Sequence, residues 1–175
     1  ALSVATIAGL ANDKVGLVAF ARRIVAASAP RAMHASPLSG LMYGLEPRFE
    51  ESDYTRAFTY LREHLHKRSM IVLFTDIIDP IAQSTLLAEI GSLARRHLVV
   101  CVLMNDEAIE KAMAEEPSGV AAAYSTAVAL GLQHERRVAG AMLAGRGSVV
   151  VDVPARKLTT ALIDEYLRIK QRGLL

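Results

Sequence analysis

Two residues stand out for the chemistry they could perform, an aspartate and a serine. Asp76 directly follows the apolar run Met70–Thr75, and Ser52 directly precedes DYTRAF, the start of a predicted helix. A carboxylate at the carboxyl end of a buried strand can hold a hard cation or take part in phosphoryl chemistry. It can equally be a loop residue that accepts backbone N–H groups. A serine hydroxyl can coordinate a metal or cap a helix.

The remaining reactive side chains indicate no common catalytic site. His64 and His66 lie two residues apart on a predicted helix, so they point about 200° apart and cannot hold one ion together. The single cysteine, Cys101, lies inside a predicted buried strand and is expected to be inert. The sequence contains no phosphate-binding loop, dinucleotide fingerprint, nucleophile elbow or HExxH motif. We therefore assign no catalytic residue and expect a protein that is not an enzyme.

Three short runs of aliphatic residues predict the strands that would carry these residues. They are Met70–Thr75, Leu98–Met104 and Ser148–Val153, and each is nearly continuous in apolar character. Such runs are typical of strands buried on both faces, as in a parallel sheet covered by helices. Helical patterns separate the runs, which gives the alternation expected of βαβ units.

Two further strands are predicted near the start of the chain. Val15–Phe20 and Arg23–Ser28 are too close together for a crossover helix, so they should form an antiparallel hairpin. Apolar spacing and capping residues predict helices in the rest of the chain. We expect the end of a helix within the first dozen residues and further helices over 36–44, 53–67, 79–96, 105–114, 120–144, with a break near Gly131 or Gly140, and 158–171.

Composition favours one globular domain spanning 1–175. The chain has 52% hydrophobic residues, which is enough for a core, and a net charge of only +2. That charge, with 5% aromatic residues and no tryptophan, does not predict nucleic-acid binding. One cysteine fits a reducing compartment. No signal peptide or membrane span is visible, so we expect a cytoplasmic location and no membrane insertion within the chain.

Five segments distributed over nearly the whole chain resemble a bacterial family of uncharacterised proteins. They are KVGLVAF, LEPRFEESDYTRAF, SMIVLFTDIIDP, RRHLVVCVLMND and VVVDVPARKLTTALIDEYLRIKQRGLL. Members of that family have a C-terminal von Willebrand factor A-like domain and are often encoded beside MoxR-type AAA+ ATPases. The resemblance implies a doubly wound, mostly parallel sheet with helices on both faces and an antiparallel edge hairpin. The first strand of such a domain is central, between Val15–Phe20 and Met70–Thr75.

The resemblance also implies a metal-ion-dependent adhesion site that holds Mg²⁺. Such a site combines an Asp-x-Ser-x-Ser loop after the first strand, a Thr or Ser in a second loop, and an Asp after the fourth strand. By position Ser52 matches the second element and Asp76 the third. The Asp-x-Ser-x-Ser loop does not occur in this sequence. Since Ala1–Asn12 resembles the helix that follows this loop, we expect the first strand upstream of Ala1, and the domain in 1–175 to be truncated at its N-terminus.

Three functions remain open from the sequence. The first is a protein interaction module that binds a partner through the metal. The partner would be a MoxR-type ATPase or its client, and the parent protein could be anchored in the membrane. The second is a metal-free structural or regulatory α/β domain, because Mg²⁺ needs near-octahedral oxygen ligands and two side chains would hold it weakly. The third is a phosphohydrolase that uses Asp76, although the acids of TDIID lack the Asp-x-Asp spacing of haloacid-dehalogenase-like enzymes.

Overall fold

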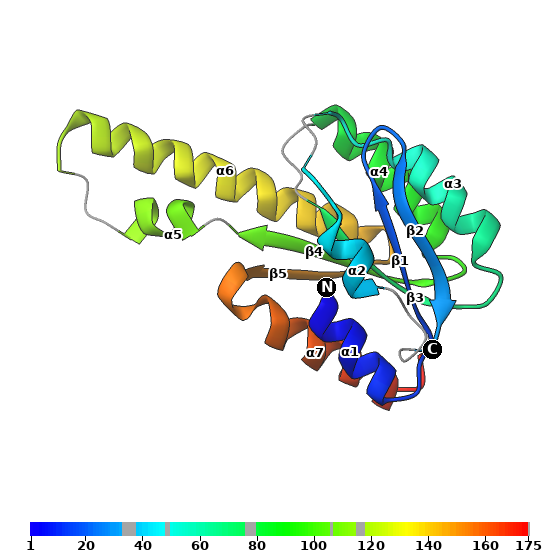
Figure 1. Ribbon diagram of the computed structural model, residues 1–175. Coiled ribbons are helices and arrows are strands. Elements are labelled where there is room, and N and C mark those ends of the chain that lie inside the picture. Colours follow the sequence, from blue (N-terminus) through cyan, green and yellow to red (C-terminus); the bar gives the residue numbers. More distant parts are fainter. Residues whose placement is uncertain (33–37, 48–49, 76–79, 106, 115–117, 175) are drawn as a thin grey trace. The chain divides into compact units, whose positions relative to one another are not determined.

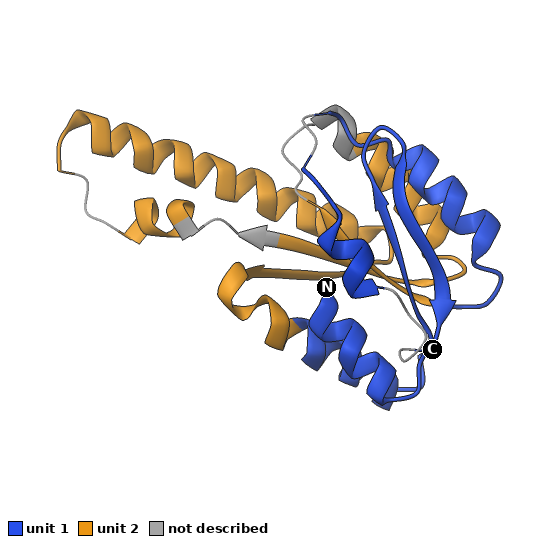
Figure 2. Ribbon diagram, viewed as in Figure 1, with its two compact units in different colours: residues 1–68, 162–175 blue, residues 69–161 orange. Residues whose placement is uncertain are grey.

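The chain is a mixed α/β protein. The computed structural model describes residues 1–32, 38–47, 50–75, 80–105, 107–114 and 118–174 (Figure 1). These residues form two compact units, one made of residues 1–68 and 162–175 and the other of residues 69–161 (Figure 2). The described part of the first unit contains a two-stranded antiparallel sheet, and that of the second contains a three-stranded parallel sheet.

The hairpin of the first unit agrees with its prediction. β1 (Val15–Phe20) pairs antiparallel with β2 (Ile24–Arg31), and β2 runs three residues further than predicted. The register is irregular at both ends of β1, with shifts between Val15 and Leu17 and between Ala19 and Phe20. The connecting turn is closed by a hydrogen bond from the Ala21 N–H to the Arg23 carbonyl, at 2.9 Å.

Four helices contribute to the first unit. They are α1 (Leu2–Leu10), α2 (Leu38–Tyr43), α3 (Tyr54–His64) and, from residue 162 onward, α7 (Ala155–Gln171). α3 buries Tyr54, Ala57 and Phe58 on one face and ends at His64, earlier than predicted, because Leu65 adopts an extended conformation. The cap predicted at residues 36–37 lies outside the described residues.

The parallel sheet of the second unit confirms the three predicted strands. β3 (Met70–Thr75), β4 (Leu98–Asn105) and β5 (Val149–Pro154) lie in the order β3-β4-β5, and both pairings are parallel without a register shift. The central strand is the most buried part of the unit, since Val100, Cys101 and Val102 have no exposed surface. Burial on both faces explains why β4 is continuously apolar, whereas most residues of β3 and β5 are only half-buried.

Three helices lie wholly within the second unit. They are α4 (Pro80–Leu93), α5 (Glu107–Ala114) and α6 (Val120–Gly145). α4 buries Leu86, Ile90 and Leu93, which share one face at helical spacing. α6 is a single helix of 26 residues, so the predicted break near Gly131 or Gly140 is wrong. It extends beyond the strands, and α5 lies alongside its outer part (Figure 1).

The two edge strands of the parallel sheet differ in how they are protected. β5 carries the exposed Asp152, whose carboxylate accepts a hydrogen bond of 2.9 Å from Arg136 on α6, and the strand ends at Pro154. Charges and prolines are the usual means by which a sheet edge avoids pairing with further strands. β3 has the sequence MIVLFT, with neither a charge nor a proline. Among the residues that the structure describes, β3 pairs in this sheet with β4 alone, and its other edge lacks this protection.

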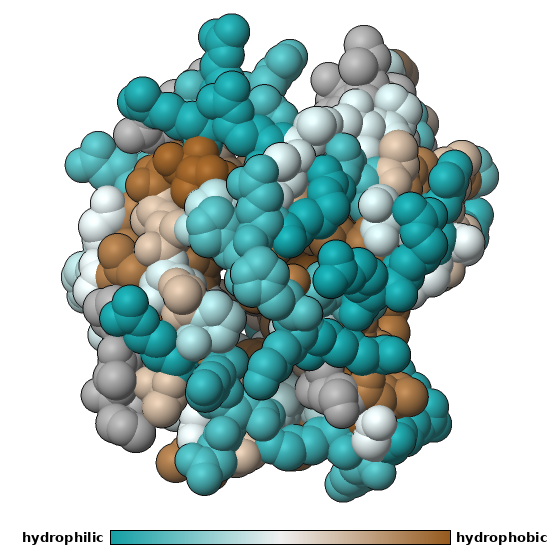
Figure 3. All heavy atoms as spheres, turned by 90° about the vertical axis from the view of Figure 1, so that its right-hand side faces the viewer, coloured by the Kyte–Doolittle hydropathy of each residue, from teal (hydrophilic) through white to brown (hydrophobic). Residues whose placement is uncertain are grey.

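The surface seen in Figure 3 is mostly hydrophilic, and hydrophobic side chains show in patches between the polar ones. Single apolar side chains at the surface are normal for a folded domain. No helix in the described ranges combines the length and the apolar character that a membrane crossing requires.

The close approach of the two hairpin strands at Gly16 gives the first prediction. A Cβ atom at this position would lie 2.7 Å from the carbonyl oxygen of Ser28 and 3.0 Å from the nitrogen of Pro30. Both are backbone atoms, so the strands would have to move apart. Gly16→Ala should lower the free energy of unfolding by about 1–3 kcal/mol, measured by urea denaturation.

A second glycine provides the control. Gly40 lies in α2, and a Cβ atom added there would meet no other atom within 4 Å. Gly40→Ala should therefore leave stability unchanged or raise it by up to about 1 kcal/mol. Equal denaturation midpoints for the Gly16 and Gly40 variants would contradict the tight strand contact.

Candidate functional site

Ser52 lies on an exposed segment just before α3, in the first unit. It lines a pocket of about 230 Å³ at the end of the hairpin. The other lining residues come from the hairpin and from the segment after α2: Ala19, Phe20, Ala21, Val25, Leu45, Glu46, Pro47 and Glu50. The hydroxyl is therefore accessible to solvent and to a ligand.

Backbone hydrogen bonds hold this segment against the hairpin. The Asp53 N–H donates to the Ala21 carbonyl at 2.9 Å, which places the residue after Ser52 beside the turn. The Asp53 carboxylate accepts a hydrogen bond of 2.8 Å from the Arg56 N–H and is the N-cap of α3. The alternative that Ser52 caps this helix is therefore wrong, and its hydroxyl is not used for capping.

Aromatic packing fixes the start of α3. Tyr54 is 8% exposed, and its ring meets that of Phe20 edge-on with centroids 5.7 Å apart. The Tyr54 ring also contacts Phe58 at 6.2 Å. Edge-to-face aromatic pairs contribute about 0.5–1.5 kcal/mol beyond their buried area. The segment that carries Ser52 is thus held in place by the backbone hydrogen bond of Asp53 and by the packing of the Tyr54 side chain.

The described polar side chains that line the pocket with Ser52 carry carboxylate oxygens. Glu46 and Glu50 line the same pocket and both are exposed. Carboxylate and hydroxyl oxygens are the ligands that hard divalent cations prefer. Across the ranges that the structure describes, no group of three His, Cys, Asp or Glu side chains could hold a metal ion. The donor set near Ser52 fits a hard cation in type, and ligands from elsewhere would be needed to complete a site.

Asp76 lies outside the described residues, which end in this region at Thr75. Thr75 is the last residue of β3 and is 6% exposed. β3 belongs to the second unit and Ser52 to the first. The joint action of Ser52 and Asp76 therefore stays a prediction.

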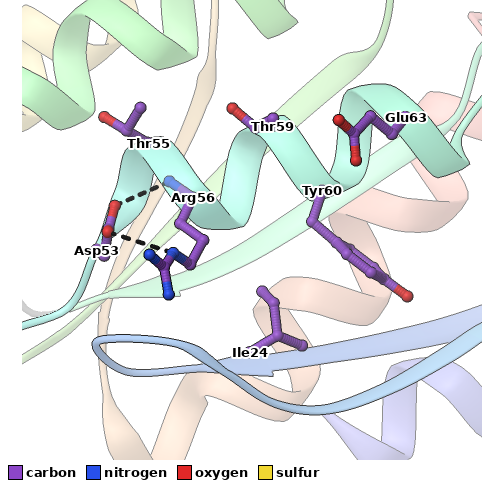
Figure 4. A pocket seen from close by; sticks show the side chains of 7 residues that line it. All are labelled: Ile24, Asp53, Thr55, Arg56, Thr59, Tyr60 and Glu63. Atoms are coloured by element: carbon purple, nitrogen blue, oxygen red, sulfur yellow. Dashed lines mark hydrogen bonds and ion pairs between the residues drawn. The ribbon is translucent and has the colours of Figure 1, made fainter.

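A second pocket of about 460 Å³ runs along α3 (Figure 4). Arg56 and Asp53 face each other at its rim, with Arg56 Nε 3.7 Å from Asp53 Oδ2. Their opposite charges offset each other, so the pair adds little net charge to the pocket. Tyr60 at the other end stacks on His64, with ring centroids 3.9 Å apart.

The other reactive residues behave as predicted. His64 and His66 are both exposed, as predicted, but only His64 lies in α3, so the helical spacing assumed for the pair does not apply. Cys101 has no exposed surface, and burial raises the pKa of its thiol to about 11, although a hydrogen bond with Ser148 opposes the shift. A thiol of this kind is protonated at neutral pH and shielded from reagents, so it is inert.

One cluster of titratable groups in the first unit was not predicted. The Tyr166 hydroxyl of α7 donates a 2.5 Å hydrogen bond to Asp13, and Lys170 donates to the same carboxylate oxygen at 2.8 Å. Lys170 also donates to the Ala11 carbonyl at 3.0 Å. Tyr166 and Lys170 are four residues apart on one helix face, which is the only local signal in the sequence. We call these three side chains, Asp13, Tyr166 and Lys170, the terminal clasp.

The terminal clasp changes the titration of its members. Burial alone would raise the pKa of Asp13, but hydrogen bonds from Lys170 and Tyr166 and the charge of Lys170 lower it overall. The pKa of Tyr166 is raised by burial and by its bond to Asp13. These contacts join the start of the chain to its last helix and serve stability within the first unit.

Comparison with known proteins assigns the family. The fold and the pocket define a mixed α/β protein with an exposed hydroxyl and carboxylates beside a hairpin. Residues 1–145 match the model of a family described as a protein of unknown function, DUF58. Since this match covers most of the chain, the protein belongs to that family, and the predicted membership of an uncharacterised family is confirmed to this extent. Comparison with curated proteins and with solved structures found no match.

The terminal clasp gives the second prediction. The pKa of Asp13 is lowered on folding, so its contribution to stability is present above the ordinary carboxyl pKa of 3.8 and is lost as the pH falls below it. Asp13→Ala should lower the free energy of unfolding by about 1–2 kcal/mol at pH 7, because the buried Tyr166 hydroxyl loses its acceptor.

The pH dependence distinguishes this effect from a general loss of packing. The difference between wild type and Asp13→Ala should shrink as the pH falls from 5 towards 2 in urea denaturation series. Asp164→Ala, on an exposed position of α7, serves as a control and should change stability little at any of these pH values. A constant difference for Asp13→Ala would contradict the titration of the clasp.

Proposed function

We propose that this chain is the larger part of a von Willebrand factor A-like domain that binds a protein partner through a divalent-metal site. The observation that carries the proposal is the position of β3 at the edge of its sheet. This uncharged strand is an edge of the three-stranded parallel sheet, and the chain leaves its carboxyl end directly into Asp76. In open α/β sheets that end of the strands is where ligands bind.

In the described part of the chain β3 pairs in its sheet with β4 alone, which supports a further strand beside it in the complete domain. MIVLFT has the continuous apolar character of an interior strand, whereas the opposite edge strand carries Asp152 and Pro154. In the von Willebrand factor A-like order the first strand takes the place beside β3. We propose that a segment from outside this chain supplies that strand, and with it the Asp-x-Ser-x-Ser loop.

Ser52 and Asp76 are the residues of this chain that would hold the metal. Ser52 is exposed, is not needed to cap α3, and has carboxylates in the same pocket, so its surroundings fit an oxygen-liganded cation such as Mg²⁺. When bound, the ion would supply an open coordination position for a carboxylate of the partner. Ser52 and Asp76 would orient that ion, and the Asp76 carboxylate would offset part of its charge.

The proposed partner is a MoxR-type AAA+ ATPase or its client, as the family resemblance implies. The function proposed is binding without turnover, in the cytoplasm or on the cytoplasmic side of a membrane-anchored parent protein. A metal-free regulatory domain is the second candidate. It is favoured by the absence of Asp-x-Ser-x-Ser from the sequence.

A pull-down experiment tests the metal-dependent contact. The full-length DUF58 protein is immobilised, and recovery of a MoxR-type ATPase from the same organism is measured at constant Mg²⁺ concentration. Asp76→Ala should reduce recovery by about tenfold or more, because one ligand of the bridging ion is lost. Asp164→Ala, which removes an exposed acid elsewhere, should leave recovery unchanged.

The outcomes separate the candidate functions. Equal recovery with wild type and Asp76→Ala would reject the metal-bridged contact and favour the metal-free domain. The coding sequence upstream of Ala1 gives an independent check, since an apolar strand there without Asp-x-Ser-x-Ser would contradict the metal site. Phosphatase activity that Asp76→Ala abolishes would contradict the proposal and identify an enzyme.

A further inference from the structure

α6 exposes a stripe of large apolar side chains on its surface. Val120 is 89% exposed, Tyr124 73%, Val138 37% and Met142 49%. These four residues lie at separations of four, fourteen and four, which at about 100° per residue places them within one narrow face of the helix. We call this face, with Ala127, Gly131 and Glu135 between its two halves, the α6 stripe.

The α6 stripe is not the face that packs inside the second unit. The buried positions of this helix are Ala129, Ala139 and Leu143, which lie on a different side. α5 contacts yet another side, where the Thr126 hydroxyl donates to the Ala112 carbonyl at 3.0 Å. A helix with apolar residues on its packed side and on a separate exposed side has apolar surface left to bury. Val128, Leu130 and Leu132 of α6 are also exposed but lie outside the stripe.

The α6 stripe is symmetric about Gly131. Val120 and Met142 are each eleven residues from this glycine, Tyr124 and Val138 are each seven, and Ala127 and Glu135 are each four. Separations of four and three residues are those of the seam between packed helices. Gly131 itself has open space around its Cβ position, so another helix could approach its backbone closely.

The charges on α6 indicate whether two such helices would pack parallel or antiparallel. Residues 120–133 of the helix carry no charge, whereas His134, Glu135, Arg136 and Arg137 follow directly. In a parallel pair, Glu135 would face Glu135 of the other helix, and like charges repel. In an antiparallel pair centred on Gly131, Glu135 faces Ala127 and the charged half lies along the uncharged half.

We infer that the α6 stripe binds the same stripe of a second copy of this chain. The two helices run antiparallel and cross at Gly131, with Val120 opposite Met142 and Tyr124 opposite Val138. The contact is isologous, as a two-fold dimer requires. The seam is about 33 Å long, given the 1.5 Å rise per residue, and about one helix wide. This is the small end of specific interfaces, so the dimer is reversible and concentration-dependent.

Cysteine cross-linking tests the register and the direction. Gly131→Cys places a thiol on the two-fold axis and should give a disulfide-linked dimer under mild oxidation. Tyr124→Cys should not cross-link to itself, because its two copies lie about 21 Å apart along the antiparallel seam. Cys101 is buried and gives no background. Cross-linking of Tyr124→Cys, or none of Gly131→Cys, would overturn the antiparallel pairing.

Sedimentation over a range of protein concentrations tests the apolar contact itself. Tyr124→Asp should weaken the dimer by about tenfold or more, since it puts a charge into the seam. Leu130→Asp is the matched control: Leu130 is 53% exposed on the same helix but lies about 120° from Tyr124, so the dimer should persist. A wild-type protein that stays monomeric at all concentrations would reject the proposal. Binding of the stripe to an ATPase or to a vesicle surface in place of a second copy would also reject it.

Discussion

The parallel pairing of β4 with a neighbour on each side is the constraint on which the second unit depends. A strand as apolar as Leu98–Asn105 can be buried only if its backbone groups are paired and its two faces are covered. Parallel neighbours demand crossover helices, which α4 and α6 supply. The same pairing aligns the carboxyl ends of all three strands at one edge of the sheet. Because Asp76 directly follows β3 in the sequence, this alignment is the reason for considering it a ligand-binding residue.

Much of this fold could be predicted because burial leaves a local signal. Continuous aliphatic runs gave β3, β4 and β5 to within about one residue at each end, and their spacing gave the parallel order. The errors came from residues whose local preference is weak. Gly131 and Gly140 each disfavour a helix by about 1 kcal/mol, which the surrounding alanines offset, so α6 is continuous. Ser52 and Asp53 are both good caps, and only the structure shows that Asp53 accepts from Arg56.

The candidate site was less predictable, because its geometry depends on contacts between distant segments. The sequence shows that a hydroxyl and several carboxylates lie close together around Ser52. It does not show the hydrogen bond from the Asp53 N–H to the Ala21 carbonyl that holds this segment against the hairpin. The presence of Glu46 in the same pocket also follows only from the fold. The terminal clasp joins Asp13 and Tyr166 across 153 residues, and no local pattern records such a pair.

The terminal clasp has a consequence for how the chain matures on the ribosome. The first unit is discontinuous: it combines residues 1–68 with residues 162–175, which are synthesised after the second unit. Residues 69–161 are contiguous and can collapse as soon as they leave the exit tunnel, whereas the amino-terminal segment must wait for α7. During that interval Asp13 lacks its partners Tyr166 and Lys170, so nascent chains that stall before residue 162 are the species most in need of a chaperone.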